Sequence, residues 1–336
     1  MIGMATGQLI IGVLSDTFGR KRFIVGGAAL ALITSLLCAI APNIGVLIAA
    51  RFLQGLGSGA CVVLARSVIP DITSGVAAAK AFSWMGIISG IAPAAAPVLG
   101  SLLVSSLGWR GIFYVLAGIA AAQLLVALFV IPETRPPANR TPLSFGSFTA
   151  VIKEPVFVRY ALVVGFGFAS MFAYISASSF VMQEIMGLSP QIFALVFGTN
   201  ALGLMVGGAL NTRLLDRFPA AAILKIALII MTVAATIVLV CALTGLPRIP
   251  FFLALFFAVM PLSLVMGNAT ALAVAAVRTR AGSASSVMGF GQFLLAGLVS
   301  PLVGMVGGSQ AVGMGVCMVG AAVVAVMMFV LARRAD

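Results

Sequence analysis

Residues Gly12–Arg22 read GVLSDTFGRKR, a short charged segment between two apolar runs. The run that follows it, Phe23 to Ala41, is long enough to cross the roughly 30 Å hydrocarbon core of a bilayer as a helix. Gly19 permits a tight turn, and the three cations after it are typical of a loop held at a membrane surface. The segment therefore predicts two helices joined by a charged loop on one side of a membrane.

The rest of the chain repeats this pattern from end to end. Of its 336 residues 62% are hydrophobic and 8% are charged, whereas a soluble domain has roughly 25% charged residues. The apolar runs are continuous and do not alternate with polar residues, which favours helices over a barrel. We expect an all-α membrane protein whose eleven helices cover Met1 to Leu14, Phe23 to Ala41, Ile44 to Arg66, Val76 to Val104, Gly111 to Ile131, Tyr160 to Met182, Gln191 to Leu210, Ala220 to Leu243, Phe251 to Val274, Ser283 to Val306 and Ala311 to Leu331.

The basic residues predict the orientation of these helices. Arg51 and Arg66 fall in or at the end of a span, and of the other Lys and Arg residues only Arg110 and Arg248 fall on the second side. Because cytoplasmic loops retain positive charge, the first loop and the carboxyl terminus are predicted to be cytoplasmic. The amino terminus is then outside, an uncommon start for an unprocessed chain, so we expect one further helix upstream of Met1 and twelve in all.

The longest polar segment predicts the domain boundary. It covers residues 132–159, is rich in Pro, Arg and Ser, and is typical of a cytoplasmic linker. The predicted domains are an amino-terminal helical bundle at 1–131, the linker at 132–159 and a carboxyl-terminal bundle at 160–336. Gly208–Arg217 weakly repeats Gly12–Lys21, as expected of a transporter built from two related halves.

Several functional classes find no support in the composition. There is no His, and Cys38, Cys61, Cys241 and Cys317 each lie in an apolar run, so we predict neither a metal site nor a disulfide framework. The net charge of +12 comes from short clusters between spans and forms no basic stripe, so a nucleic-acid partner is not expected. The phosphate-loop pattern of ATPases does not occur, and we expect no cofactor and no enzymatic activity.

The charged segment resembles the signature loop of the major facilitator superfamily. Gly12, Asp16, Gly19, Arg20 and Lys21 stand in the positions of that motif. The resemblance implies a gate on the cytoplasmic side, in which Asp16 and Arg20 act together with Asp71. An alternative is that the basic residues only anchor the loop by the positive-inside effect, but a carboxylate such as Asp16 at a helix end requires a partner.

A second motif resembles the fourth helix of the same superfamily. It contains Arg51, Gln54 and glycines at positions 55, 57 and 59. A guanidinium within an apolar helix is costly unless it faces a watery cavity or a partner, so Arg51 is a candidate functional residue. The resemblance implies that it couples proton movement to substrate. The alternative is that Arg51 extends to the outer interface, because it lies near the start of its helix.

A third motif resembles the antiporter motif of the fifth helix, in which Gly and Pro residues bend the helix and allow tight packing. Its residues are Gly86, Gly90, Pro93, Pro97 and Gly100. The copy lacks an adjacent Gly-Pro pair, and small-residue packing alone is the alternative. Together with Gly108-Trp109-Arg110 and Pro132-Glu133-Thr134, this region resembles the bicyclomycin and chloramphenicol resistance (Bcr/CflA-type) drug exporters.

The carboxyl-terminal half carries fewer candidate residues. Asn200, Asn268, Gln292 and Ser300 are more often helix-packing residues than ligand contacts. The seven acidic residues are Asp16, Asp71, Glu133, Glu154, Glu184, Asp216 and Asp336, and none lies in the middle of an apolar run. A proton-coupled exporter needs an acid inside the membrane, and the resemblance places one in the first helix, upstream of Met1.

The sequence thus predicts a monomeric secondary transporter of the bacterial inner membrane. Its expected partners are protons, a small drug-like substrate and the lipid bilayer, and the resemblance implies export by alternating access of the two bundles. The alternatives are a transporter of a metabolite such as a sugar or an amino acid, and an inactive truncated relative.

Overall fold

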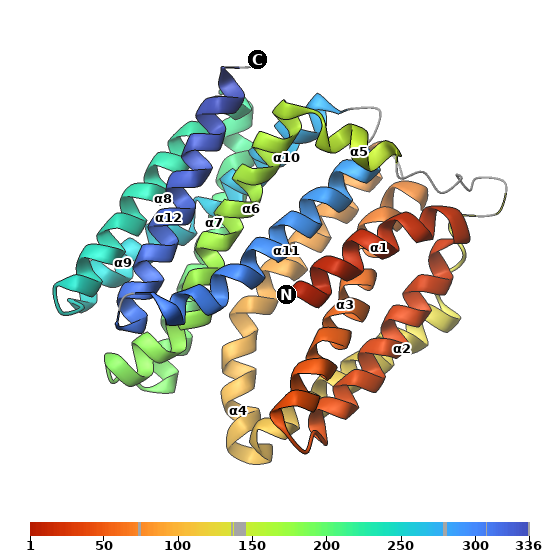
Figure 1. Cartoon of the computed structure of the whole chain (residues 1–336), viewed down its shortest axis with the longest axis horizontal. Helices are drawn as coiled ribbons and strands as arrows, with labels where there is room; N and C mark the ends of the chain where they lie inside the picture. Colours follow the sequence, from red (N-terminus) through yellow and green to blue (C-terminus); the bar gives the residue numbers. More distant parts are fainter. Residues whose placement is uncertain (73–74, 136, 138–145, 278–280, 307, 335–336) are drawn as a thin grey trace. The chain divides into compact units, whose positions relative to one another are not determined.

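The structure, a computed structural model, consists of helices and turns, with no strand among the residues that it describes (Figure 1). It describes residues 1–336 apart from 73–74, 136, 138–145, 278–280, 307 and 335–336. Side chains are described for these residues except 13, 16, 70, 75–95, 97–98, 101–102, 105, 146–148 and 281–282.

Contacts group the chain into two units. The first holds Met1–Gly86, Leu99–Ala150 and Gly282–Phe293, and the second holds Ile87–Val98, Val151–Ala281 and Leu294–Asp336. The main boundary, between Ala150 and Val151, falls within the predicted linker. The assignment of residues 1–131 and 160–336 to two bundles stays a prediction.

Among the described residues, four helices precede the predicted linker, and a short fifth helix lies within it. They are α1 (Ile2–Phe18), α2 (Arg20–Ala39), α3 (Ile44–Ile72), α4 (Gly75–Phe129) and the short α5 (Gly146–Ile152). Helix α4 combines two helices that the sequence separates, and the non-helical backbone inside it lies at Gly108, with φ 66°. Glycine adopts this left-handed conformation without steric cost, so the direction of the chain can change there.

Helix α6 (Pro155–Ser179) already begins within the predicted linker. It is followed by the π-helical turn η2 (Phe180–Ile185), α7 (Pro190–Leu215), α8 (Ala220–Leu243), α9 (Arg248–Val259), α10 (Leu262–Ala276), α11 (Ala281–Met305) and α12 (Gln310–Arg333). Helices α9 and α10 replace the single helix predicted over Phe251 to Val274. The interruption contains Pro261, which has no amide hydrogen to continue the helical ladder.

Nine helical segments among the described residues are long and apolar enough to cross a membrane, and Ile2–Gly12 adds a shorter apolar helix. Many large apolar side chains on these segments are exposed, including Ile48, Leu195 and Ile226. Such exposure suits contact with lipid and not with water. The chain is therefore a multi-pass helical membrane protein, as its composition predicts.

Within the first unit, α3 packs against α1 on one face and against α2 on another. A Cβ on Gly59 would collide with the backbone carbonyl of Met4 in α1. A Cβ on Gly57 would lie 2.6 Å from the carbonyl oxygen of Gly27 in α2. Small residues on both faces of α3 thus allow backbones to approach closely, which is a usual basis of helix association in membranes.

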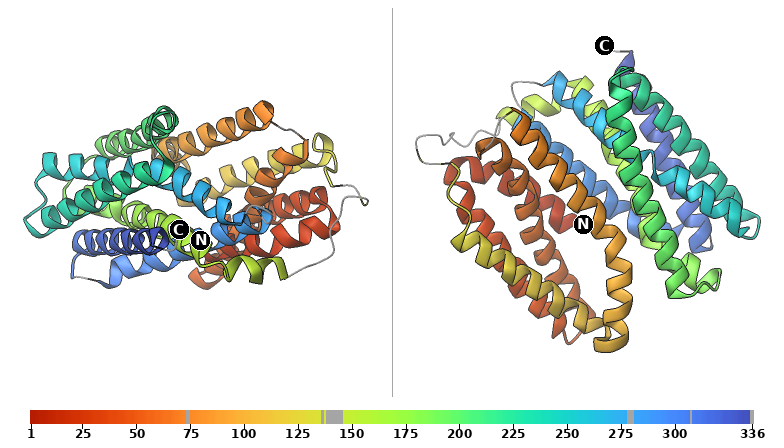
Figure 2. Two further views of the ribbon diagram at one scale, coloured as in Figure 1. Left: turned by 90° about the horizontal axis from the view of Figure 1, so that it is seen from above. Right: turned by 180° about the vertical axis from the view of Figure 1, so that it is seen from behind.

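Within the second unit, α6 packs against α10 and α12, and α8 packs against α9, α10 and α12. These neighbours can be followed in Figures 1 and 2. The core is formed by buried Ala, Val, Phe and Met side chains, with Tyr174 among the largest that are fully buried. Polar groups in it are paired: Asn268 Nδ2 in α10 donates to Asn211 Oδ1 in α7 at 2.6 Å. This agrees with the prediction that Asn268 is a packing residue.

The contact between α1 and α3 predicts that Gly59→Ala destabilises the protein. The added Cβ has no room at the Met4 carbonyl, so we expect a loss of about 1–3 kcal/mol, the usual cost of overpacking. The measurement is the midpoint of thermal unfolding of the purified protein in detergent.

Gly26→Ala is the matched control, because a Cβ at Gly26 in α2 would meet open space. Alanine favours a helix over glycine, so this variant should be neutral or slightly stabilised. Equal midpoints for the two variants would contradict the close approach of α1 and α3.

Candidate functional site

The charged loop between α1 and α2 is shorter than the sequence predicts. Helix α1 continues to Phe18 and α2 already begins at Arg20, so Gly19 is the only residue between them. Gly19 has φ 98° and ψ 151°, a conformation that is essentially limited to glycine. The turn therefore requires glycine, and it places Arg20 at the first position of α2.

Arg20 forms an ion pair with Asp71, near the end of α3. Its Nε donates to Asp71 Oδ2, and its Nη2 lies 3.4 Å from Oδ1. Arg20 is buried, with 5% of its surface exposed. A buried guanidinium is tolerated only beside a compensating charge, so this pair ties the start of α2 to the end of α3.

The segment after α4 completes this cluster. Glu133 Oε1 accepts hydrogen bonds from the backbone N–H of Arg20 at 2.9 Å and of Arg135 at 3.0 Å. Thr134 Oγ1 donates to Asp71 Oδ2 at 3.2 Å. The first N–H groups of a helix have no partner within it and carry partial positive charge, so a carboxylate is favoured there. We call Arg20, Asp71, Glu133 and Thr134 the charge clasp.

Lys21, next to Arg20, binds the carboxyl-terminal end of α4. Its Nζ donates to the carbonyl oxygen of Leu128, in the last turn of α4, at 2.9 Å. The last carbonyls of a helix are likewise unpaired, and a cation there is favourable. The loop thus joins the end of α1, the start of α2 and the ends of α3 and α4 through charged side chains.

The structure brings together part of the predicted gate. Arg20 and Asp71 are in contact, and Gly19 and Lys21 have the places described above. A Cβ on Gly12 would lie 2.7 Å from Ser286 Oγ, so Gly12 also stands at a close approach. Asp16 lies in α1, but its side chain is outside the described residues. Their gating role stays a prediction.

Glu133 and Thr134 were missing from the predicted site, although the motif containing them was recognised. The signal that could have indicated Glu133 is its type and place: it is one of only seven acidic residues and comes directly after an apolar span. Its partner at Arg20 is 113 positions away in the sequence, so spacing alone could not have predicted the contact.

Arg51 lies inside the apolar segment Ile44–Ile69 and begins a hydrogen-bond chain. Its Nη1 donates to Gln54 Oε1 at 2.6 Å, and Gln54 Nε2 donates to Ser35 Oγ at 2.6 Å. Ser35 Oγ donates in turn to the carbonyl oxygen of Ala31 at 2.6 Å. A guanidinium only donates, so the direction of every bond in this chain is fixed. We call the chain from Arg51 through Gln54 to Ser35 the relay.

The environment of the relay is partly buried. Gln54 and Ser35 have 7% and 1% of their surfaces exposed, whereas Arg51 itself is exposed. The Arg51 guanidinium also lies 5.6 Å from the ring centroid of Phe113 in α4, within the range of a cation–π contact. Two of these partners, Ser35 and Phe113, were not predicted as site residues. The guanidinium thus contacts a buried amide and a ring, and its role in coupling stays a prediction.

Gln8 in α1 is a further candidate that the sequence analysis missed. Its side chain is 1% exposed, and its Nε2 has no hydrogen-bond partner among the described residues. Its Oε1 occupies the space that a Cβ on Gly289 would need. A buried unpaired amide costs about 1–3 kcal/mol, and such groups often mark a functional site or a place for water.

The remaining predicted residues are less informative. Gly86, Gly90, Pro93 and Pro97 lie within α4, which runs through both prolines, but their surroundings are outside the described side chains. Among the described residues, nothing lies within contact of a Cβ placed on Gly100. The antiporter motif therefore stays a prediction.

Asn200 acts as the sequence analysis expected of a packing residue. Its Nδ2 donates to the hydroxyl oxygen of Tyr174 at 2.9 Å. Tyr174 in turn stacks on Phe197, with 5.6 Å between ring centroids.

Comparisons with known proteins cover nearly the whole chain. The family model of the Major Facilitator Superfamily matches residues 1–301. An uncharacterized MFS-type transporter of Bacillus subtilis, YdgK, is 35% identical over 335 residues, which are 98% of this chain and 83% of that protein. A bicyclomycin resistance protein homolog of Haemophilus influenzae is 30% identical over 305 residues, 90% of this chain and 77% of that protein. The multidrug resistance protein MdtL of Escherichia coli is 31% identical over 201 residues, 60% of this chain and 51% of that protein.

Solved structures support the fold. The human organic anion transporter MFSD10 aligns with a TM-score of 0.73 at 18% identity, over 98% of this chain and 81% of that one. The Escherichia coli fucose:proton symporter FucP aligns with a TM-score of 0.71 at 16% identity, over 100% of this chain and 89% of that one. The chain therefore belongs to the Major Facilitator Superfamily and is a multi-pass membrane transporter, not an enzyme.

Proposed function

We propose that this transporter exports drugs or other small amphipathic molecules across the bacterial inner membrane in exchange for protons. The Haemophilus and Escherichia relatives are named for resistance to bicyclomycin and to multiple drugs, which supports a drug-like substrate. The observation that carries the proposal for this chain is the relay at Arg51. A cation within an apolar span, held by a buried amide, is costly and is retained where it has a functional role.

The chemistry of Arg51 limits what it can do in coupling. A guanidinium does not release its proton in proteins, so Arg51 cannot be the group that carries the coupled proton. It acts through its positive charge, by attracting an anionic group and by repelling a cationic substrate. Gln54 and Ser35 hold the guanidinium in one orientation, so this effect has a defined place in the fold.

The charge clasp is the proposed gate. Its bonds join the start of α2, the end of α3 and the segment after α4, so any movement that separates these parts must break them. Asp16, beside the same turn, is proposed to take part, and Gly86, Gly90, Pro93, Pro97 and Gly100 are proposed to form the bending helix. The protein is proposed to act as a monomer, with its carboxyl terminus in the cytoplasm.

Arg51→Gln should abolish coupling in everted membrane vesicles. We expect drug-dependent proton release, followed with a pH-sensitive dye, to fall at least about tenfold, because the neutral amide removes the positive charge from the apolar span. Arg51→Lys keeps the charge but loses the planar fork, so it should retain part of the activity.

Arg217→Gln is the matched control, since Arg217 is exposed in the turn between α7 and α8. Bicyclomycin, chloramphenicol-type drugs and cationic dyes form the substrate panel. Wild-type proton release with sugars or amino acids, and none with this panel, would favour the metabolite-transporter alternative.

Asp71→Asn should slow transport while leaving membrane insertion intact. The substitution leaves the buried Arg20 guanidinium without its charge partner, a loss of about 1.5–3 kcal/mol for a hydrogen bond to a charged group. The measurement is the initial rate of drug efflux at equal amounts of inserted protein.

The exchanged double variant Arg20→Asp with Asp71→Arg separates a gate from a simple loop anchor. It restores the ion pair while moving the positive charge out of the loop, and the backbone bond from residue 20 to Glu133 is kept. Partial recovery of efflux supports the gate. Efflux no better than in Arg20→Asp alone would instead support anchoring by loop charge.

A further inference from the structure

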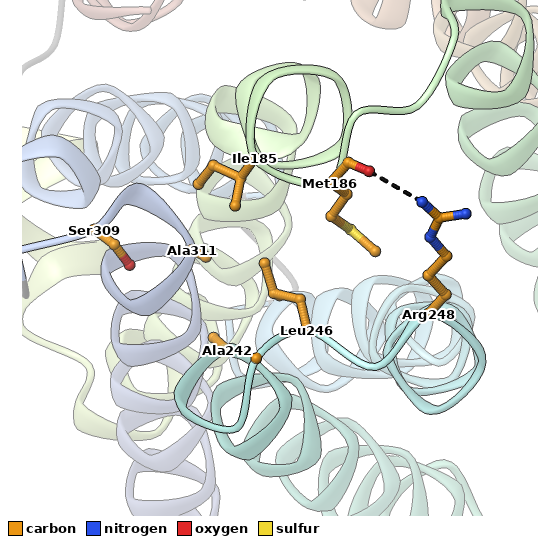
Figure 3. A pocket seen from close by; sticks show the side chains of 8 residues that line it. Ile185, Met186, Ala242, Leu246, Arg248, Ser309 and Ala311 are labelled. Carbon is orange, nitrogen blue, oxygen red and sulfur yellow. Dashed lines mark hydrogen bonds between the residues drawn. The ribbon is translucent and has the colours of Figure 1, made fainter.

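A pocket of about 430 Å³ lies at one end of the second unit (Figure 3). Its walls come from the end of η2, the turn between α8 and α9, and the start of α12. Arg248 stands at its edge beside Met186, and the Leu246 side chain lies across from Ile185. The transport mechanism proposed above makes no use of this pocket.

The pocket lies where membrane spans end. The apolar segments Pro155–Ile185 and Ala220–Leu243 end beside it, and Arg248–Ala276 and Gln310–Arg333 begin there. Spans end at the boundary between hydrocarbon and the polar headgroups. The pocket is therefore at the level of lipid headgroups and not within the hydrocarbon core.

Arg248 carries a positive charge at this pocket, and its described hydrogen-bond partner is neutral. Its Nη2 donates to the carbonyl oxygen of Met186 at 3.3 Å, a neutral acceptor (Figure 3). Among the described residues it forms no ion pair. A guanidinium has five N–H donors in a planar fork that suits phosphate, so donors remain for an anion.

Apolar side chains stand beside Arg248. Ile185 and Leu246 line the pocket together with Ser309, and Ile249, which follows Arg248 but does not line the pocket, is 73% exposed. A free phosphate ion would gain nothing from these apolar side chains, whereas a molecule with a phosphate head and a hydrocarbon body would use both. The combination of a guanidinium and exposed apolar side chains fits a phospholipid.

We propose that this pocket binds an anionic phospholipid, with the headgroup phosphate on Arg248 and the first part of its acyl chains against Ile185, Leu246 and Ile249. The first amides of α9 and α12, which begin at Arg248 and Gln310, add partial positive charge at the same place. The site would tie η2 and the α8–α9 turn to the lipid surface. The inference stands whether or not the exported substrate is a drug.

Native mass spectrometry of the full chain in detergent tests the site. The protein is titrated with phosphatidylglycerol and with phosphatidylcholine of the same acyl chains, and the dissociation constant of the first bound lipid is measured. Wild type should prefer phosphatidylglycerol. Arg248→Gln should weaken phosphatidylglycerol binding about 3- to 10-fold and phosphatidylcholine binding less, because choline offsets the charge of the phosphate, whereas Arg248→Lys should fall between wild type and Arg248→Gln.

Two further variants distinguish binding in the pocket from non-specific attraction of anionic lipid to the basic protein surface. Ala242→Phe fills the pocket while keeping Arg248, and it should also weaken phosphatidylglycerol binding. Arg217→Gln removes an exposed arginine that does not line the pocket, and it should bind as wild type does. Thermal unfolding shows whether each variant is folded. If Ala242→Phe does not fold, the Arg248→Gln result decides the test.

Three results would overturn the proposal. The first is a phosphatidylglycerol affinity that Arg248→Gln leaves unchanged. The second is equal wild-type affinity for the two lipids. The third is inorganic phosphate displacing phosphatidylglycerol at concentrations comparable to those of the lipid, because the site would then recognise the small anion and not a lipid.

Discussion

A hydrocarbon environment forces every backbone polar group to find its partner within the protein, and the other features of this structure follow from that constraint. Helices satisfy it along their length but leave unpaired N–H and C=O groups at both ends. Polar chemistry is therefore concentrated at helix ends. Glu133 occupies the start of α2, Lys21 the end of α4 and Arg248 the start of α9. Where polar side chains lie within a span, as Arg51 and Gln54 do, they bond to one another.

The same constraint explains why glycine recurs at two-residue intervals in α3. Without a hydrophobic driving force between helices, association depends on close packing of backbones. Gly55 and Gly59 are four residues apart and face α1, whereas Gly57 between them faces α2. One short motif therefore fixes two helix contacts, and it does so within one or two turns of Arg51. The packing of three helices and the position of the relay are thus set by the same segment.

Much of the fold, and less of the site, could be predicted from the sequence. Apolar runs located the helices because span length is set by the bilayer, and Arg51 was found because a cation in such a run is conspicuous. The sequence did not predict that the turn between α1 and α2 consists of Gly19 alone. Charged residues at helix ends resemble loop residues as long as their partners are unknown. Glu133 and Ser35 depend on contacts between distant segments, which no local pattern records. The buried amide of Gln8 was missed because a lone Gln in an apolar run gives no sign of its neighbours.

Arg20 begins α2 and Arg248 begins α9, and the partner of each guanidinium determines what that arginine does. Arg20 is buried and its charge is compensated by Asp71, so it joins parts of the protein and must lose that bond if those parts separate. Arg248 is exposed and bonds only a neutral carbonyl among the described residues, so its charge is available to something outside the chain. The residue type is the same, and helix-end geometry favours anions at both places. In the first case the anion is a carboxylate of the protein itself; in the second, the position at the headgroup level makes lipid phosphate the available anion.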